Sequence, residues 1–283
     1  KSIFSEKQSI SFAKTFIGFN NWFLNGGEAP VIINEKKTEK TVKNLRTYFT
    51  TIGYFKSKVT SKIEKNEDKK GTIAYYIEKG KPLFLDSIKT QIESPELDSI
   101  YKLKQDKSFL KTGDQYNETN FVNEAERITR LFRNNGGYYF SNSSIGFYNI
   151  DSASTNYKTN VLLKISDRII ENQGNYSTRD FKIQKINDVK VITDYSYNTR
   201  GEPYRDSISY KGLTYLAHKK IKYNPKYLSE SLFIKKDSIY SDSLSNLTRS
   251  HIKTLNNFKG INITYNQVEG TNNELNATIF LTP

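Results

Sequence analysis

Apolar residues recur every three or four positions in three separate stretches of the chain. This spacing places them on one face of a helix in each stretch. The positions are Val42, Leu45, Phe49 and Ile52 in the first stretch, Val122, Ala125, Ile128, Leu131 and Phe132 in the second, and Leu244, Leu247, Ile252, Leu255 and Phe258 in the third. Each predicted helix ends at or near a glycine, which tolerates the left-handed conformation common just past a helix C-terminus.

The apolar period changes to two after each helix, which predicts a β-strand. The alternating residues are Val59 and Ile63, then Ile145 and Phe147, then Ile261, Ile263 and Tyr265. A turn rich in Asn, Asp, Lys or Gly follows each time, and then a second strand in residues 72–79, 157–167 and 274–282. The chain therefore repeats a helix that leads into a β-hairpin three times.

Two of the copies extend backwards by a strand and a helix. A strand in residues 81–93 and a helix through Ile100, Leu103, Phe109 and Leu110 precede the second copy. A strand in residues 180–195 and a helix in residues 224–233 precede the third, and Pro225 suits the start of that helix. The first copy has only a helix in residues 11–24, ended by Gly26 and Gly27, so its opening strand is expected at or before Lys1.

These elements predict an α+β fold of tandem β-α-α-β-β repeats, each a three-stranded mixed sheet covered on one face by two helices. The predicted repeats span residues 1–79, 80–171 and 179–283. A division into two domains with an irregular N-terminal helical piece is the alternative. A polar insertion near residues 197–210 is expected to be a long loop, which either binds a partner or only connects.

Aromatic residues on the helix faces, namely Trp22, Phe49, Phe132 and Phe258, are expected to fill the space between helices and sheets. The pair Gly136–Gly137 is expected to end a helix and form a turn. Phosphate-binding glycine loops run from strand to helix, whereas this pair runs from helix to strand.

The 283 residues include neither Cys nor Met. The lack of Cys excludes disulfides, thiolate–metal sites and cysteine nucleophiles. Without an initiator Met, a transmembrane run or a signal peptide, the chain is expected to be a piece of a longer gene product. The net charge of +13 suits an anionic partner such as nucleic acid, lipid headgroups or lipid A phosphates. Scattered lysines instead favour an ordinary solvated surface, and no nucleic-acid-binding motif is present.

Catalysis is not expected from this sequence. His218 lies among lysines, and His251 lies on a predicted helix beside Arg249 and Ser250. Neither histidine has acidic residues at the spacing of a ligand set or a catalytic triad, so both are expected on the surface or a helix flank. We predict no enzyme activity, no metal and no cofactor.

Three passages carry a resemblance to a known family: NLRTYFTTIGYFKSKV, EAERITRLFRNNGGYYFSN and TRSHIKTLNNFKGINITY. With the β-α-α-β-β order they resemble the polypeptide-transport-associated (POTRA) repeats of BamA/TamA-like outer-membrane assembly factors. Residues 222–243 are similar to the last repeat of such proteins. The Lys- and Asn-rich composition and KGKPLFLDSI are most similar to the TamA-like lipoproteins of the Bacteroidota, called TamL. BamA members usually carry five repeats, whereas this chain shows three whole or partial copies, which favours the TamA-like branch.

The resemblance implies the periplasmic portion of an outer-membrane protein, with a β-barrel expected after Pro283. The partners it implies are unfolded outer-membrane proteins or other exported clients, an inner-membrane or periplasmic partner subunit, the protein's own barrel and the membrane surface, but no nucleic acid. An edge strand offers unpaired N–H and C=O groups, so an extended client can join the sheet as one more strand.

In the family the second strand of each repeat lies at the edge, which places the candidate edges at residues 56–63, 140–147 and 261–265. The candidate client-binding residues are Lys58, Val59, Thr60, Ser61, Ser141, Asn142, Ser143, Ser144, Ile145, Ile261, Asn262, Ile263, Thr264 and Tyr265. Ordinary edge strands protected by Lys and Asn are the alternative, most of all for the first edge, with its Lys56, Lys58 and Lys62.

Asp-Ser followed by a small or aliphatic residue recurs along the chain and resembles the O-glycosylation sequence of exported Bacteroidota proteins. The candidate serines are Ser87, Ser99, Ser152, Ser207, Ser238 and Ser243. Helix caps and turns are the alternative explanation, as at Asp242 or Ser243 before the last long helix.

Two other classes of function stay open. One is a free-standing periplasmic or surface binding module with no barrel attached. The other is a basic protein that binds anions or nucleic acid, whose affinity would fall steeply with salt.

Overall fold

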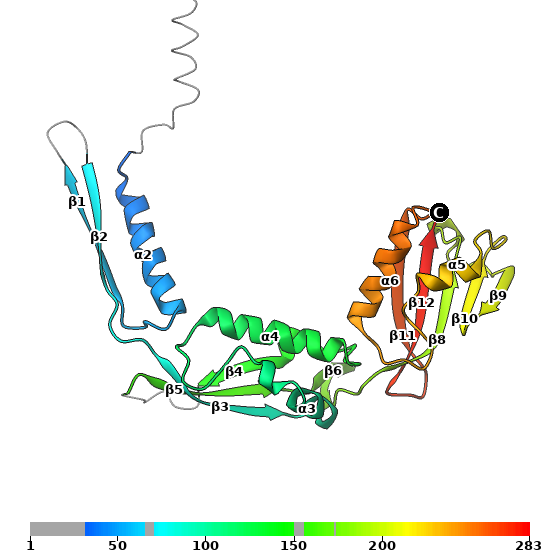
Figure 1. Ribbon diagram of the computed structural model, residues 1–283, viewed down its shortest axis with the longest axis horizontal. Coiled ribbons are helices and arrows are strands. Elements are labelled where there is room, and N and C mark those ends of the chain that lie inside the picture. The colour runs from blue at the N-terminus through cyan, green and yellow to red at the C-terminus, as the bar shows by residue number, and fades with distance from the viewer. Residues whose placement is uncertain (1–31, 66–70, 150–155, 173) are drawn as a thin grey trace, which may run out of the picture. The chain divides into compact units, whose positions relative to one another are not determined.

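The computed structural model describes residues 32–65, 71–149, 156–172 and 174–283 (Figure 1). The chain divides into two compact units. The first comprises the described residues up to Tyr48 with Ser57–Glu78, and the second comprises Phe49–Lys56 with Lys79–Pro283. The helix expected in residues 11–24, with its glycine stop and Trp22, lies outside the described residues. Among the described helices, none combines the length and apolarity that crossing a membrane requires.

The first unit contains most of helix α2 (Glu35–Thr51) and an antiparallel hairpin of β1 (Lys58–Lys65) and β2 (Gly71–Glu78). The Asn34 side chain accepts a hydrogen bond from the Lys37 N–H (3.2 Å) at the start of the helix. Val59 and Ile63 are half-buried, whereas the residues between them are exposed. The predicted change from helical to strand period is confirmed here.

The second repeat begins the larger unit. Its elements are β3 (Phe84–Ile92), α3 (Pro95–Lys102), α4 (Glu118–Arg133), β4 (Ile145–Asn149) and β5 (Lys158–Ile165). β5 is the central strand, parallel to β3 and antiparallel to β4. α4 lies along one side of this sheet (Figure 1). Its Ile128 and Phe132 are fully buried against Leu97, Phe140 and Leu163.

The predicted helix through Leu110 is wrong beyond Lys102. Leu103 is 77% exposed, and a short 3-10 turn, η1 (Gln105–Lys107), follows. The polar run between Leu103 and Phe109 offers no apolar face to hold a helix on the sheet. The fully buried carboxylate of Glu124 holds this connection instead, because it accepts the Phe109 N–H (3.0 Å) and pairs with Arg127 (2.7 Å).

A hairpin of β6 (Arg168–Asn172) and β7 (Asn175–Arg179) follows the second repeat, and the sequence pattern did not predict it. It connects the second repeat to the first strand of the third.

The third repeat has a five-stranded sheet in the order β11-β12-β8-β10-β9. Its elements are β8 (Lys185–Ile192), β9 (Asp206–Tyr210), β10 (Leu213–Ala217), α5 (Pro225–Glu230), α6 (Asp242–Thr254), β11 (Gly260–Gln267) and β12 (Glu274–Thr282). β12 is parallel to β8 and antiparallel to β11, which repeats the mixed pattern of the second sheet. Alternate residues of β12, from Leu275 to Leu281, are buried in the core on the helix side. The predicted fold class is confirmed in both of these repeats.

The polar insertion is not the loop that we expected. After a short 3-10 turn, η3 (Tyr197–Thr199), the chain forms the β9–β10 hairpin, and β10 pairs in parallel with β8. Lys211 and Gly212 both have positive φ (50° and 73°) between the paired residues Tyr210 and Leu213, as in a two-residue type I′ turn. The insertion therefore widens the sheet and covers the edge of β8.

Candidate functional site: the edge of β11

Two of the three candidate strands lie at the edge of a mixed sheet, as carried over from the family. These are β4 in the second repeat and β11 in the third. β1 pairs with β2 alone within the described residues. β4 is the second strand of its repeat, whereas the inserted strands β9 and β10 precede β11 in the third repeat.

The backbone of β11 alternates between bonded and open groups. The Val268 N–H donates to the Glu274 carbonyl (3.0 Å), which makes this opposed pair a hydrogen-bonded one. Since bonded and unbonded pairs alternate in an antiparallel ladder, Asn262 and Thr264 bond to β12. The N–H and C=O groups of Ile261 and Ile263 therefore face away from β12, at the edge of the sheet.

One end of this edge is covered by the preceding repeat. The Tyr138 hydroxyl donates to the Tyr265 carbonyl at 3.3 Å, and the Tyr139 hydroxyl donates to the side chain of Gln267 at 3.1 Å. The segment from Ile261 to Ile263 is thus the part of β11 that is free to accept another strand.

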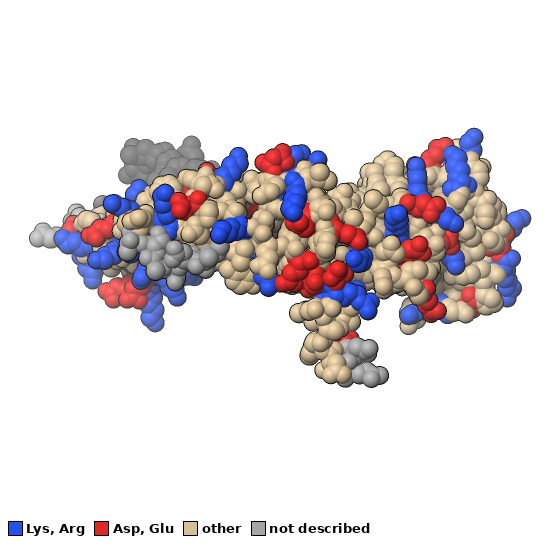
Figure 2. Space-filling model, turned by 90° about the horizontal axis from the view of Figure 1, so that it is seen from below, with Lys and Arg blue, Asp and Glu red and all other residues tan. Residues whose placement is uncertain are grey.

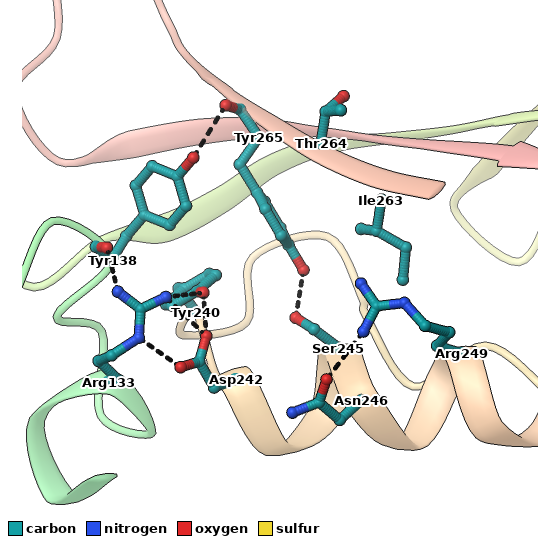
Figure 3. Close-up of a pocket in the computed structure, with 10 residues that line it drawn as sticks. All are labelled: Arg133, Tyr138, Tyr240, Asp242, Ser245, Asn246, Arg249, Ile263, Thr264 and Tyr265. Carbon is teal, nitrogen blue, oxygen red and sulfur yellow. Dashed lines mark hydrogen bonds and ion pairs between the residues drawn. The ribbon is translucent and has the colours of Figure 1, made fainter. Parts of the chain in front are cut away.

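A hollow of about 500 Å³, which we call the helix-side hollow, lies between β11 and α6 (Figure 3). The residues that line it are Arg133, Tyr138, Tyr240, Asp242, Ser245, Asn246, Arg249, Ile263, Thr264 and Tyr265. Burial raises the pKa of Tyr265 to about 12, so its hydroxyl stays protonated, and it lies 2.5 Å from the Ser245 hydroxyl. This contact fixes the Tyr265 ring as one wall of the hollow.

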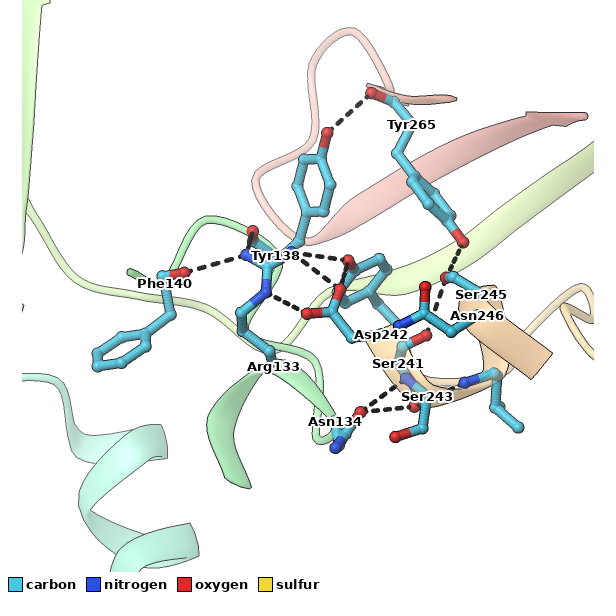
Figure 4. Close-up of polar contacts among 12 residues, drawn as sticks. Arg133, Asn134, Tyr138, Phe140, Ser241, Asp242, Ser243, Ser245, Asn246 and Tyr265 are labelled. Atoms are coloured by element: carbon cyan, nitrogen blue, oxygen red, sulfur yellow. Dashed lines mark hydrogen bonds and ion pairs between the residues drawn. The ribbon is translucent and has the colours of Figure 1, made fainter. Parts of the chain in front are cut away.

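Arg133 holds one end of the hollow in place (Figure 4). Its guanidinium bonds both carboxylate oxygens of Asp242 and the Tyr240 hydroxyl (3.0 Å), and it donates to the carbonyls of Tyr138 (2.8 Å) and Phe140 (3.0 Å). Arg133 ends α4 and Asp242 begins α6, so this network ties the second repeat to the third. Burial opposes ionisation of Asp242, but the bonds from Arg133 and Tyr240 outweigh it and lower the pKa of the carboxyl group.

A triangle of backbone hydrogen bonds completes this inter-repeat joint. Gly136 N–H donates to Tyr240 C=O (3.0 Å), Tyr240 N–H to Gln184 C=O (2.9 Å), and Gln184 N–H to Gly136 C=O (3.0 Å). Gly136 has a φ of +94°, and a Cβ built there would lie 2.5 Å from Ile183 Cγ2. Only glycine fits here without strain. The Gly136–Gly137 turn expected from the sequence is therefore also part of the joint.

The candidate edge of the second repeat is shorter than expected. Asn142, Ser143 and Ser144 form the 3-10 turn η2, preceded by Ser141 as its N-cap, so the strand assignment is wrong for these four residues. Ser and Asn favour such turns over strands, and the hydroxyls of Ser141 and Ser143 lie 2.6 Å apart across this one. Ile145 does begin strand β4.

The β4 edge shows the same alternation as β11. The Ser166 N–H donates to the Ser144 carbonyl (3.0 Å), so the backbone groups of Ile145 and Phe147 face away from β5. The Tyr148 ring lies over Gly146, within 3 Å of where a Cβ would be. In β1, Lys58, Thr60 and Ser61 are exposed and Val59 is half-buried, with the ladder to β2 running the full strand.

The Asp-Ser serines differ in exposure. Ser99, Ser207 and Ser243 are exposed, whereas Ser87 and Ser238 are half-buried. Ser87 donates to Asn160 Oδ1 (2.6 Å) and Ser238 to the Lys235 carbonyl (2.6 Å). Ser152 lies outside the described residues. The helix-cap interpretation is not confirmed for Asp242 or Ser243, because Ser241 caps α6.

The expectation that His218 lies on the surface is wrong. It is 5% exposed, its Nδ1 lies 3.1 Å from Asp194 Oδ1, and Tyr204 packs on its ring. His251 is exposed on α6 as expected. In the part of the chain that the structure describes, no group of three or more His, Cys, Asp or Glu could hold a metal ion.

Lys and Arg side chains are interspersed with Asp and Glu on the face drawn in Figure 2, without a single large basic patch. This distribution agrees with a solvated surface on that face.

No protein-family model matches the chain, and neither does any curated protein. Among solved structures, the crystal structure of BamA POTRA domains 3–5 from Haemophilus influenzae is similar with a TM-score of 0.39 and 13% identity, over 87% of this chain and 80% of that chain. BamA from Haemophilus ducreyi lacking POTRA domains 1–3 gives 0.44 and 9%, over 70% of this chain and 29% of that one. The N-terminal domain of Omp85 from Thermosynechococcus elongatus gives 0.29 and 10%, over 86% and 83%. No residue of these proteins is carried over at such values.

Proposed function

We propose that this chain is the periplasmic client-binding region of a BamA/TamA-like outer-membrane assembly factor, and that extended clients join its sheets at open edges. The observation that carries the proposal is the edge of β11. It offers outward backbone groups at Ile261 and Ile263, and the helix-side hollow lies beside it. Main-chain hydrogen bonds supply the affinity in this mode and side-chain pockets supply the selectivity, which suits a factor with many different clients.

The finer assignments of the proposal rest on the sequence resemblance. They are the TamL branch of the Bacteroidota, a lipid anchor, a β-barrel after Pro283, a partner subunit in the periplasm or inner membrane, and glycosylation at exposed Asp-Ser sites. The gene beyond Pro283 tests the barrel. The account requires about a dozen or more amphipathic strands of roughly ten residues each. A stop codon or a globular domain there would leave a free-standing binding module.

Photo-cross-linking tests client binding directly. A photo-reactive residue at Asn262, exposed on the edge strand, should capture an unfolded precursor of an outer-membrane barrel protein. The matched control is Lys190, which is also exposed but belongs to the inner strand β8. It lies two strands from Thr264 in the register of the sheet, on the same face as Thr264 and Asn262. Equal capture at both positions would refute recruitment at the edge. If DNA of arbitrary sequence displaces the precursor, and capture falls steeply as the salt concentration rises, the result would instead indicate a nucleic-acid binder.

A further inference from the structure

A second hollow lies against the other face of β11. Its volume is about 480 Å³, and the β11 residues that line it are Asn262, Thr264 and Asn266. These alternate along the strand with Ile263 and Tyr265, so their side chains belong to the sheet face away from the helices. We call it the open-face hollow. The edge strand thus has one hollow on each face.

The segment between β8 and β9 forms the open-face hollow. Ile192, the last residue of β8, is only 2% exposed, but it is not part of the core between the sheet and the helices. Its side chain is therefore buried on the helix-free face, where this segment covers it. The Tyr195 ring packs on Phe280 with centroids 4.8 Å apart, and the Arg205 N–H donates to the Ala217 carbonyl at 2.9 Å. Both ends of the segment are therefore anchored to the sheet.

Each hollow contains one arginine without a carboxylate partner. Arg249 lines the helix-side hollow and donates only to the neutral amide of Asn246 (2.8 Å) in the described contacts. Arg200 lines the open-face hollow. Neither forms an ion pair within the described residues. The carboxylate of Asp194 already accepts the N–H groups of His218 (2.9 Å) and Lys219 (3.1 Å).

We propose that β11 selects extended segments that carry carboxylates on both faces, one paired with Arg249 and the other with Arg200. This inference rests on the proposed function, since it requires strand addition at β11. Successive side chains of an added strand point to opposite faces of the sheet. The two carboxylates must therefore be an odd number of residues apart. The net charge of +13 adds a general attraction for such acidic segments.

Three labelled peptides of identical length test the inference with the full chain, by fluorescence anisotropy at low salt. The first has two Glu residues three apart in a Thr/Val strand, so that they point to opposite faces. The second has them two apart, on one face. The third carries Gln in place of Glu. The opposite-face peptide should bind about five-fold more tightly than the same-face peptide, since one further exposed ion pair contributes up to about 1 kcal/mol.

The variants Arg200→Gln and Arg249→Gln should each abolish the advantage of the opposite-face peptide. Lys190→Gln and Lys253→Gln remove an exposed charge from β8 and α6 respectively and should preserve that advantage. If all three peptides bind at β11 with equal affinity, the two-faced selection is wrong while strand addition stands. If no peptide, the Gln peptide included, protects the amides of Ile261 and Ile263 from hydrogen exchange, the proposed function itself fails.

Discussion

Substitution of Gly136 by alanine should open the joint between the second and third repeats. The residue has a φ of +94°, which costs about 1–2 kcal/mol for a side chain with a Cβ. The new Cβ would also lie 2.5 Å from Ile183 Cγ2 and 3.0 Å from the Gln184 nitrogen. Overpacking of this kind costs about 1–3 kcal/mol. Together these effects destabilise the closed joint, where three backbone segments meet, by about 2–5 kcal/mol.

Gly113 supplies the matched control for this substitution. Its φ is +89°, and no atom lies within 4 Å of a Cβ built there. Gly113→Ala therefore costs only the free energy of placing a residue with a Cβ at positive φ, without the overpacking. The difference between the two variants isolates the packing of the joint, and about 1–3 kcal/mol corresponds to a factor of about 5 to 150 in an opening equilibrium.

Native-state hydrogen exchange measures this opening at the amides that hold the joint. The Gln184 N–H donates across it to Gly136, and the Tyr240 N–H donates to Gln184 within the same triangle, so their protection should fall by the factor above in Gly136→Ala relative to Gly113→Ala. Amides in the centre of β5 serve as an internal reference. Equal protection of Gln184 and Tyr240 in the two variants would refute the close packing at Gly136.

Two further predictions concern the polar network of the joint. Arg133→Gln should lower the free energy of unfolding, measured in urea, by about 2–3 kcal/mol. The Arg133 and Asp242 side chains are only 27% and 34% exposed, and two backbone carbonyls lose their donor. The control Lys102→Gln, which breaks an exposed ion pair, should change the free energy of unfolding by less than about 1 kcal/mol. The pKa of Asp242 is lower in the folded chain than its ordinary value of 3.8, so its stabilisation is present above that value and is lost as the pH falls below it. Asp242→Asn should therefore flatten the acid side of the stability profile below about pH 5, and an unchanged slope would contradict this assignment.

Local patterns predicted the repeated unit well. The helical spacing through Ile128 and Phe132 and the strand alternation at Ile261 and Ile263 both appear in the structure, because burial of one face determines each element. The errors occur where polar residues dominate. Strand β9 was missed because Ser207 and Ser209 make its sequence polar. The two-residue turn at Lys211 and Gly212, between two alternating segments, could have predicted the β9–β10 hairpin.

The joint and the two hollows could not be predicted from local sequence. Arg133 and Asp242 are 109 residues apart, and nothing in either segment indicates that the two meet. The same holds for Arg200 and Arg249, which flank one strand only because the insertion folds over the helix-free face. Such contacts depend on the packing of whole repeats, which sequence periodicity does not specify.

Amide hydrogen exchange along β11, with and without an unfolded outer-membrane barrel precursor, tests strand addition most directly. The account predicts an alternating result, with new protection at Ile261 and Ile263, whose N–H groups face outward. The amides of Asn262 and Thr264 already bond to β12 and should change little. Protection that is uniform along the strand, or confined to α6, would contradict recruitment at this edge.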